Sequence, residues 1–188
     1  MSDKQLPTPE ELRKLLRYEP DTGLLYWRER TVSMFNEGTR SVEVMCRIWN
    51  ANYSGNEAFV TYNENGDLTG GILRRKYKSH RVAYAIFHGV WPENYIDHIN
   101  GVRDDNRIVN LRDVSRAENM KNAAVSSANT SGAIGVDWLK VNKKWRARIK
   151  VDGATINIGC YKTKKEAMSA RKDAEKKYGF HVNHGRKA

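Results

Sequence analysis

The chain has 188 residues, 39% of them hydrophobic, and a formal net charge of +11 at pH 7. This length suffices for one ordinary domain or two small ones, and five Trp and nine Tyr exclude a disordered basic tail. No stretch predicts a membrane helix or a signal peptide, so we expect a cytoplasmic protein with no membrane partner. Cys46 and Cys160 lie far apart without Cys-x-x-Cys spacing, which argues against a zinc site or a disulfide framework.

The positive charge is confined to the C-terminal third. Residues 121–188 hold 16 Lys and Arg against 5 Asp and Glu, an excess of 11, whereas residues 1–120 are neutral. This asymmetry is typical of a polyanion-binding module joined to a neutral one. A solvated basic surface fits the charge alone equally well, so charge does not decide between the two.

Residues 1–66 predict an N-terminal helix and strand module with a polar insertion. Thr8-Pro9-Glu10-Glu11 has the residue types of a helix start, and the helix is predicted to run to about Tyr18. A turn and a strand over 24–27 follow. Residues 33–67 are polar and rich in Gly, and they indicate only short strand-like pieces and a hairpin turn at Asn65-Gly66.

Residues 67–122 predict a second segment of mixed helix and strand. A basic strand is expected around Leu73–Tyr77, followed by a helix that Ser79 caps and Gly89 ends. One strand is expected to end at Tyr95-Ile96, and another covers 108–112. Ser115-Arg116-Ala117-Glu118 then has the pattern of a capping box and begins a further helix.

The small polar residues 123–131 predict a linker, and residues 132–188 predict a small α+β domain. A strand over 135–139 is followed by strict alternation of apolar and basic residues over 145–151. Asp152-Gly153 is a two-residue hairpin turn, a third strand returns over 154–160, and a capping box opens the final helix at Thr163. The alternation places one polar set on the sheet face away from this helix: Arg146, Arg148 and Lys150, joined by Thr155 and Asn157 if the register follows the turn.

Residue types that suit metal-assisted hydrolysis occur together between 97 and 119. Asp97 stands beside His98, and Asn110 and Asn119 follow 13 and 22 residues after Asp97. A carboxylate, a histidine and amide oxygens are what hydrolysis of a phosphodiester by one hard metal ion requires. A lone Asp-His pair is usually structural, Asn106 fits a turn stabiliser better than a catalyst, and a calcium loop would need an acid that is missing here.

The same stretch resembles the HNH (His-Me finger) endonuclease motif of the phage and homing type, whose fold is the ββα-metal motif. The resemblance implies that Asp97 and Asn119 bind one divalent ion, that His98 is the general base, and that the side-chain carbonyl of Asn110 orients the imidazole. The last position of the family pattern is often His. Because Asn119 is a hard oxygen ligand, we expect Mg²⁺ or Mn²⁺ and no zinc.

Four further residues near this motif are candidates for a supporting role. His80 and Arg81 resemble the His-Arg pair that precedes the motif in relatives of the family. A helix start packed near the site and a contact with DNA explain that pair equally well. Asn106 and Arg107 complete the set, since both lie between the candidate base and Asn110.

The C-terminal residues resemble the Apetala-type DNA-binding domain, over Ser131–Trp138, Lys144–Ile149 and Ile158–Tyr161. The resemblance implies a three-stranded sheet in the major groove of double-stranded DNA, with Arg146, Arg148, Lys150, Thr155 and Asn157 facing the bases. Ile134 and Asp137 depart from the pattern, because base-reading arginines usually stand there. Lys140 and Lys144 are expected to meet phosphates, which position DNA without specifying its sequence.

We therefore predict an α+β protein with four parts: a module over 1–66, an HNH nuclease core over 67–122, a linker over 123–131 and a DNA-binding domain over 132–188. The predicted function is homing-like, metal-dependent nicking or double-strand cleavage of DNA by a monomer or weak dimer, with no small-molecule substrate. If the gene belongs to a phage, the setting is the host cytoplasm. The alternative is a non-catalytic DNA-binding regulator with a decayed HNH domain. An RNA-binding factor is a third possibility, but the exposed aromatic pattern of such modules is missing.

Overall fold

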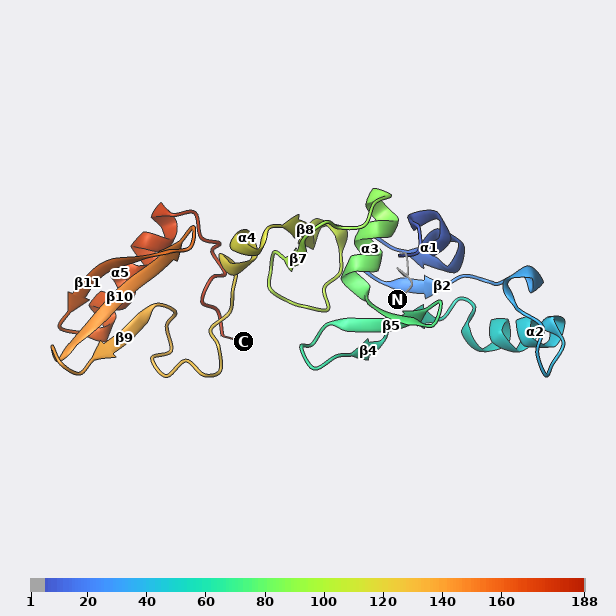
Figure 1. The fold of residues 1–188 in the computed structure, drawn as a ribbon, viewed down its shortest axis with the longest axis horizontal. Coiled ribbons are helices and arrows are strands. Elements are labelled where there is room, and N and C mark those ends of the chain that lie inside the picture. The colour runs from blue at the N-terminus through green and yellow to red at the C-terminus, as the bar shows by residue number, and fades with distance from the viewer. Residues whose placement is uncertain (1–5, 188) are drawn as a thin grey trace, which may run out of the picture. The chain divides into compact units, whose positions relative to one another are not determined.

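The computed structural model describes residues 6–187 and shows a mixed α and β protein with small antiparallel sheets. The chain divides into two compact units, Met1–Asp113 and Val114–Ala188, and each is described by itself. Figure 1 shows the order of the elements along the chain. Within residues 6–187, no helix combines the length and the apolar character needed to cross a membrane.

The first helix is shorter than predicted. α1 (Pro9–Leu15) begins as expected, with Pro at its first turn and a capping box between Thr8 and Glu11. It ends at Leu16, where the backbone becomes extended, because β1 (Leu16–Tyr18) pairs antiparallel with β2 (Leu25–Trp27). The prediction of a helix to Tyr18 was therefore wrong, since pairing within a sheet overrides the local helical pattern.

The polar insertion contains a helix that we did not predict. After the short 3₁₀ turn η1 (Val32–Met34), α2 (Val42–Tyr53) runs for 12 residues, and the side chain of its N-cap Ser41 accepts a hydrogen bond from Val44 N. β3 (Glu57–Ala58) then pairs with β2 and completes the sheet β1-β2-β3. The signal for α2 was available, because a Ser cap precedes apolar residues at helical spacing.

A second sheet, β4-β5-β6, follows the insertion. β4 (Thr61–Tyr62) and β5 (Leu68–Ile72) form a hairpin around the predicted turn at Asn65-Gly66. β6 (Arg75–Lys78) begins later than predicted, because Leu73 and Arg74 have positive φ angles of 50° and 62° and turn the chain. Type I′ turns require such angles at both central residues, so the strand prediction at Leu73 was wrong.

α3 (Ser79–His88) supplies much of the core of the first unit. It ends at Gly89 in the left-handed conformation, as predicted, but its N-cap is Lys78 without a side-chain cap, so Ser79 is not the cap. α3 contributes three residues to an apolar core shared with α1 and both sheets: Leu12, Leu16, Leu25, Ala58, Phe59, Ile72, Val82, Ala85 and Ile86. The core therefore holds α3 in place, and the chain continues from α3 toward the next strand.

A two-stranded sheet follows the core helix. β7 (Tyr95–His98) pairs with β8 (Leu111–Val114), and the 3₁₀ turn η2 (Ile108–Asn110) immediately precedes β8. The second strand therefore starts three residues later than predicted. Between the strands, residues 99–107 form a loop that returns the chain toward η2.

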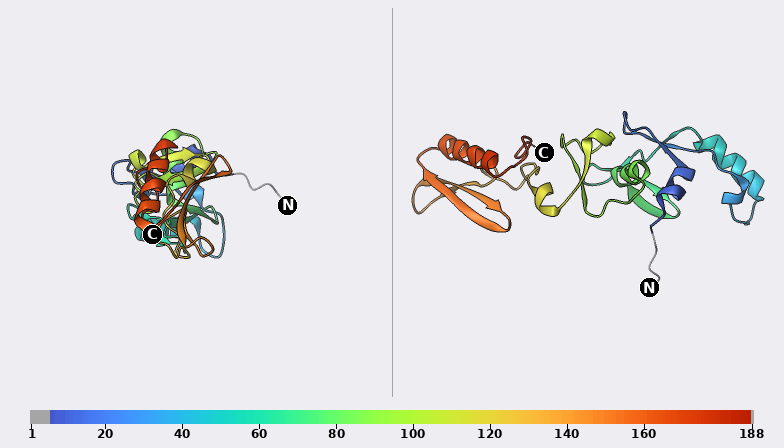
Figure 2. Two further views of the ribbon diagram at one scale, coloured as in Figure 1. Left: turned by 90° about the vertical axis from the view of Figure 1, so that its left-hand side faces the viewer. Right: turned by 90° about the horizontal axis from the view of Figure 1, so that it is seen from above.

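The second unit has the elements that its sequence pattern predicts. α4 (Arg116–Met120) has the capping box, β9 (Val136–Leu139), β10 (Lys144–Val151) and β11 (Ala154–Tyr161) form a sheet in the order β11-β10-β9, and α5 (Lys164–Lys177) covers one face. Figure 2 shows α5 as a layer beside the strands. Val136, Ala147 and Ala167 are the buried centre of this packing.

The connection after α4 is bonded to the C-terminal segment. His181 N donates to Lys121 O at 3.0 Å, Gly185 N donates to Ala123 O at 2.9 Å, and Val125 N donates to Arg186 O at 2.8 Å. These backbone bonds hold Ala123 and Val125, at the start of the predicted linker, within the second unit.

Candidate active site

The strand β7 buries an acid and a histidine next to each other in sequence. Asp97 and His98 are each only 6% exposed, although both side chains are ionisable. Burial of such groups is costly unless they are hydrogen-bonded or paired, so their partners determine what they can do.

Asp97 is paired with a residue that the sequence did not single out. Arg112, on the neighbouring strand β8, donates to Asp97 Oδ2 from its Nε at 2.9 Å and from a terminal nitrogen at 2.7 Å. This geometry is that of a strong, charge-assisted pair. Asp97 therefore holds a cationic group against its carboxylate, and no sequence periodicity pointed to Arg112 as its partner.

The imidazole of His98 faces a buried asparagine. Asn106 is 1% exposed, and its Oδ1 lies 3.1 Å from His98 Nε2. The tautomer with hydrogen on Nε2 can donate to this oxygen, and in that tautomer the lone pair of the neutral ring is on Nδ1. Burial lowers the pKa of His98 below its ordinary value, against the opposing effects of the Asn106 bond and nearby carboxylates.

His80 packs against His98 from the start of α3. Their ring centroids are 5.1 Å apart with the planes at 81°, and His80 is buried. Burial, followed by the nearby His98, lowers the pKa of His80 to about 3. His80 is therefore neutral near pH 7, and its ring packs against the candidate base. This agrees with the first of our two interpretations, a helix start packed near the site.

Asn110 bonds to the backbone of the loop that follows His98. Its Oδ1 accepts from Asn100 N at 2.9 Å, and its Nδ2 donates to Asp105 O at 2.7 Å. The family resemblance implied a bond from this side chain to the imidazole of His98. In the structure the side chain instead bonds to two backbone groups of the loop 99–107 and holds them together. Asn110 itself is buried, and its two bonds to the backbone fix the path of the loop.

Asp105 adds a second restraint inside the loop. Arg107 donates to both of its carboxylate oxygens, at 2.8 and 2.6 Å, and Asn100 Nδ2 donates to it at 2.6 Å. The Arg107 bond is the main reason why the pKa of Asp105 is lowered to about 2, and Asn100 adds to it. Arg107 thus binds within the loop, and Arg81 binds Asn94 O and Pro92 O before β7.

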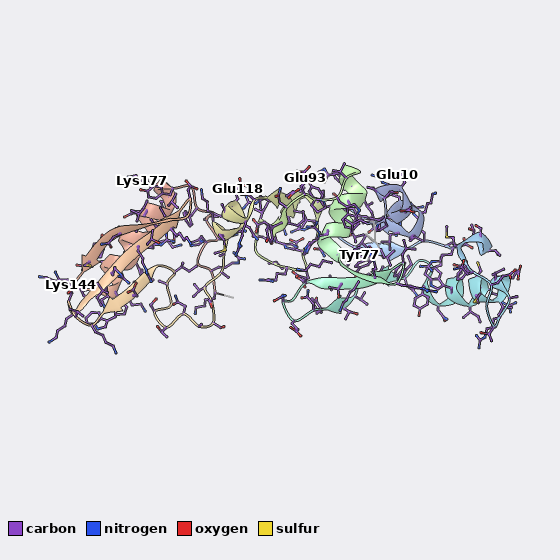
Figure 3. The ribbon with its side chains drawn as sticks, in the orientation of Figure 1. Glu10, Tyr77, Glu93, Glu118, Lys144 and Lys177 are labelled. Carbon is purple, nitrogen blue, oxygen red and sulfur yellow. The ribbon has the colours of Figure 1, made fainter. Side chains whose placement is uncertain are left out.

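Asn119, the second expected metal ligand, lies in the second unit. It is in the five-residue helix α4, whose capping box joins Ser115 and Glu118 as predicted, and its backbone nitrogen donates to Ser115 O at 3.0 Å. Figure 3 marks the position of Glu118 on this helix. A ligand role for Asn119 beside Asp97 stays a prediction.

The outward face of the C-terminal sheet gathers the predicted basic and polar residues. Arg148 lies opposite Asn157 and Lys150 opposite Thr155 in the β10–β11 ladder, which confirms the register predicted from the Asp152-Gly153 turn. The alternate residues Ala147 and Ile149 are buried on the α5 side. Lys144 stands at the start of β10, where Figure 3 shows it at one end of the sheet.

One acid interrupts this basic face. Asp137 on β9 binds Arg146, with oxygen–nitrogen distances of 2.7 and 3.3 Å, and lies 3.4 Å from the Nε of Arg148. The sequence marked Asp137 only as a departure from the Apetala-type pattern. The structure shows what the departure does: it neutralises part of the charge and holds two arginines side by side.

Comparisons with known proteins identify the family of this chain. Residues 77–121 match the family model described as HNH endonuclease. Protein 3.8 of Escherichia phage T7 is 31% identical over 94 residues, covering 46% of this chain and 78% of the phage protein. The chain belongs to the family of Protein 3.8. Its residues 77–121 are an HNH endonuclease domain. No solved structure matches significantly.

The HNH domain contains the buried residues described above. Asp97, His98, Asn106 and Asn110 lie within the match, as does Asn119, whereas the sheet β9–β11 lies outside it. Within residues 6–187, no three His, Cys, Asp or Glu side chains gather in a group that could hold a metal ion.

Proposed function

We propose that the chain is a DNA endonuclease that hydrolyses phosphodiester bonds with the help of one divalent metal ion. The observation that carries the proposal is the HNH endonuclease domain over 77–121, in which β7 buries His98 directly after Asp97. A buried histidine beside a carboxylate supplies the two functions that such hydrolysis needs, a base for water and a charge that holds a cation.

His98 acts as the general base in this proposal. Its lowered pKa keeps the imidazole neutral near pH 7, so that it can accept a proton. The Asn106 carbonyl at Nε2 leaves the lone pair on Nδ1, which is then the atom that takes the proton of the attacking water. Asn110 acts indirectly, because it fixes the loop that carries Asn106.

Asp97 and Asn119 would hold the metal ion. The arrangement at Asp97 fits a cation, because its carboxylate already binds the guanidinium of Arg112. One carboxylate and one amide oxygen are hard ligands, and Mg²⁺ or Mn²⁺ completes such a set with water. When bound, the ion stabilises negative charge on the scissile phosphate and the leaving oxygen. Arg112 would release Asp97 to make room for it.

The outward face of the C-terminal sheet is proposed to bind duplex DNA. Arg148 and Lys150 are exposed on a strand whose other face is buried against α5, and Asp137 offsets only part of the charge of this face, which leaves it attractive to an anionic partner. A sheet of this width fits the major groove. Arg146, Thr155 and Asn157 share the face, and Lys140 and Lys144 would meet phosphates.

The test is incubation of supercoiled plasmid with the protein in Mg²⁺ or in EDTA. We expect the wild-type protein to give nicked or linear product in Mg²⁺ and none in EDTA. The His98→Ala variant should give none in either, and circular dichroism checks that it is folded. Equal product from wild type and variant would reject the nuclease. An intact plasmid together with a persistent gel shift would instead identify a non-catalytic DNA-binding protein.

A further inference from the structure

Tyr18, at the end of β1, reaches a loop that lies 88 residues further along the chain. Its hydroxyl donates to the backbone carbonyl of Asn106 at 2.7 Å, and the side chain is half-buried. The ring also packs against the apolar core of the first unit. The hydroxyl thus ties the core to the loop at the residue that faces His98.

The turn that follows Tyr18 contacts the same short stretch of backbone. Ile108 N donates to Pro20 O at 3.0 Å. Gly23 has a φ of +80°, and a Cβ there would lie 2.5 Å from Arg107 N and 2.5 Å from the Asn106 carbonyl carbon. Only a glycine allows this approach. Residues 106–108, at the end of the loop and the start of η2, therefore lie against the turn at 18–23.

Asn106 connects this contact to the candidate base. Its backbone carbonyl accepts from Tyr18, and its side-chain oxygen lies 3.1 Å from His98 Nε2. Its Nδ2 is buried with no hydrogen-bond partner among residues 6–187, so the bond to His98 is what orients the amide. A shift of the Asn106 backbone would move the carbonyl that selects the imidazole tautomer.

We propose that Tyr18 is a positioning residue for His98, acting through Asn106, so that the N-terminal module is a working part of the nuclease site. The inference deepens the proposed function and rests on it for its kinetic readout. It gives a role to residues 18–23, which the HNH domain match at 77–121 does not include.

The hydroxyl of Tyr18 remains a donor throughout the working pH range. Burial, with smaller effects from the charges of Asp105 and Asp21, raises the pKa of Tyr18 far above its ordinary value of 10.0. Tyr18→Phe removes this donor and keeps the ring that packs on the core. The substitution therefore separates the bond to Asn106 from the packing.

The kinetic test compares Tyr18→Phe with a matched tyrosine. Tyr62 donates to Asp104 Oδ2 at 2.9 Å, in the same loop, but it binds a side chain and not the backbone carbonyl of Asn106. We expect Tyr18→Phe to lower the single-turnover nicking rate at saturating protein about tenfold, with unchanged affinity for plasmid. Tyr62→Phe should leave the rate unchanged. In an Asn106→Ala background, Tyr18→Phe should add no further loss, because the two residues act in series.

A second readout needs no activity. Long-range ¹H–¹⁵N spectra of the metal-free protein report the tautomer of His98, assigned with His98→Gln. We expect one tautomer with hydrogen on Nε2 in the wild type, and mixed tautomers in Tyr18→Phe and Asn106→Ala. A folded Tyr18→Phe variant that leaves the His98 signals unchanged would overturn the inference, whatever Asn106→Ala does. If Tyr18→Phe fails to fold, Gly23→Ala, which displaces the same backbone, gives the same test.

The two proposals fail in distinguishable ways. A wild type that never nicks plasmid, but whose His98 tautomer changes in Tyr18→Phe, would reject the nuclease and keep the positioning role. A wild type that nicks plasmid, with Tyr18→Phe nicking at the same rate and showing the same His98 signals, would keep the nuclease and reject the role of Tyr18.

Discussion

In Met1–Asp113 the polar side chains of the candidate site are buried and bonded to one another, whereas in Val114–Ala188 those of the candidate DNA face lie on the surface. Asp97, His98, Asn106 and Asn110 are almost fully buried, while Arg148 retains about half of its side-chain exposure at 48%. The charge follows the same division. The first unit is neutral, and the second carries 17 Lys and Arg against 6 Asp and Glu.

The difference shows how each unit can be damaged. A buried network loses function when one bond is removed, because the remaining groups are left without partners or move. An exposed charged face loses function gradually, since each side chain contributes a separate share of the attraction to an anionic partner. The predictions below test this contrast.

The largest effect is expected from Asn110→Ala. The substitution removes the bonds to Asn100 N and Asp105 O, so that the loop 99–107 and the Asn106 carbonyl facing His98 are displaced. We expect plasmid nicking to fall about 100-fold, the range of a misplaced general base. The free energy of unfolding, measured by urea denaturation, should fall by about 1–3 kcal/mol for each buried group that is left without a hydrogen bond.

Asn50→Ala is the matched control for this loop variant. The side chain of Asn50 also binds a backbone segment at both ends, because its Oδ1 accepts from Arg30 N and its Nδ2 donates to Arg30 O, both at 2.9 Å, and it lies outside the HNH match. It should lower stability without a comparable loss of nicking below its melting temperature. Equal losses of nicking in the two variants would show that stability, not positioning, explains the effect of Asn110.

A smaller effect is expected from Arg148→Gln combined with Lys150→Gln. Duplex affinity should fall about tenfold near physiological salt, and the slope of log affinity against log salt should flatten by about 1.8 if both residues meet phosphates. Lys176→Gln with Lys177→Gln removes the same charge from α5, behind the sheet, and should change affinity much less. Equal losses of duplex affinity in the two double variants would show that the total charge, and not the sheet face, determines binding.

Asp137→Asn tests the acid within this face. Loss of its negative charge frees Arg146 and Arg148 from their ion pair, so affinity for a random duplex should rise about threefold, as expected for an exposed pair worth under 1 kcal/mol. Fluorescence anisotropy at two salt concentrations measures the change. Unchanged or weaker binding would show that Asp137 holds the arginines in place for DNA instead of competing with it.

The smallest effect concerns pH. The pKa of Asp105 is lowered from 3.8 to about 2 in the folded protein, so its ionised form stabilises the fold. That contribution is complete above about pH 4 and is lost as the pH falls toward 2. The stability difference between wild type and Asp105→Asn should therefore shrink over this range in urea titrations. A constant difference would exclude the ion pair with Arg107 as its source.

The second unit was predictable because its pattern is local. Alternation over 145–151, the Asp152-Gly153 turn and the capping box at Thr163 each depend on neighbours in sequence, and the structure has the strands and the helix that they predict. The helix start at Thr8 and the capping box of α4 were predicted correctly for the same reason.

The first unit was less predictable because its important contacts are distant in sequence. Asp97 and His98 stood out by residue type. The pairing of Asp97 with Arg112 and the contact of His98 with Asn106 depend on the path of the loop 99–107. The contact of Tyr18 with Asn106 crosses 88 residues, and no periodicity marks it. Residue types thus suggested the chemistry, whereas the bonds that orient it required the fold.

The pairing of residues 121–125 with 181–186 has a practical consequence. The segment that follows α4 and the segment that follows α5 lie side by side, joined by three backbone hydrogen bonds. A unit whose entering and leaving segments lie together can be exchanged as a whole, since the exchange needs only one junction. Recombination at such a junction would join the HNH domain to a different C-terminal unit and leave the fold of each unchanged.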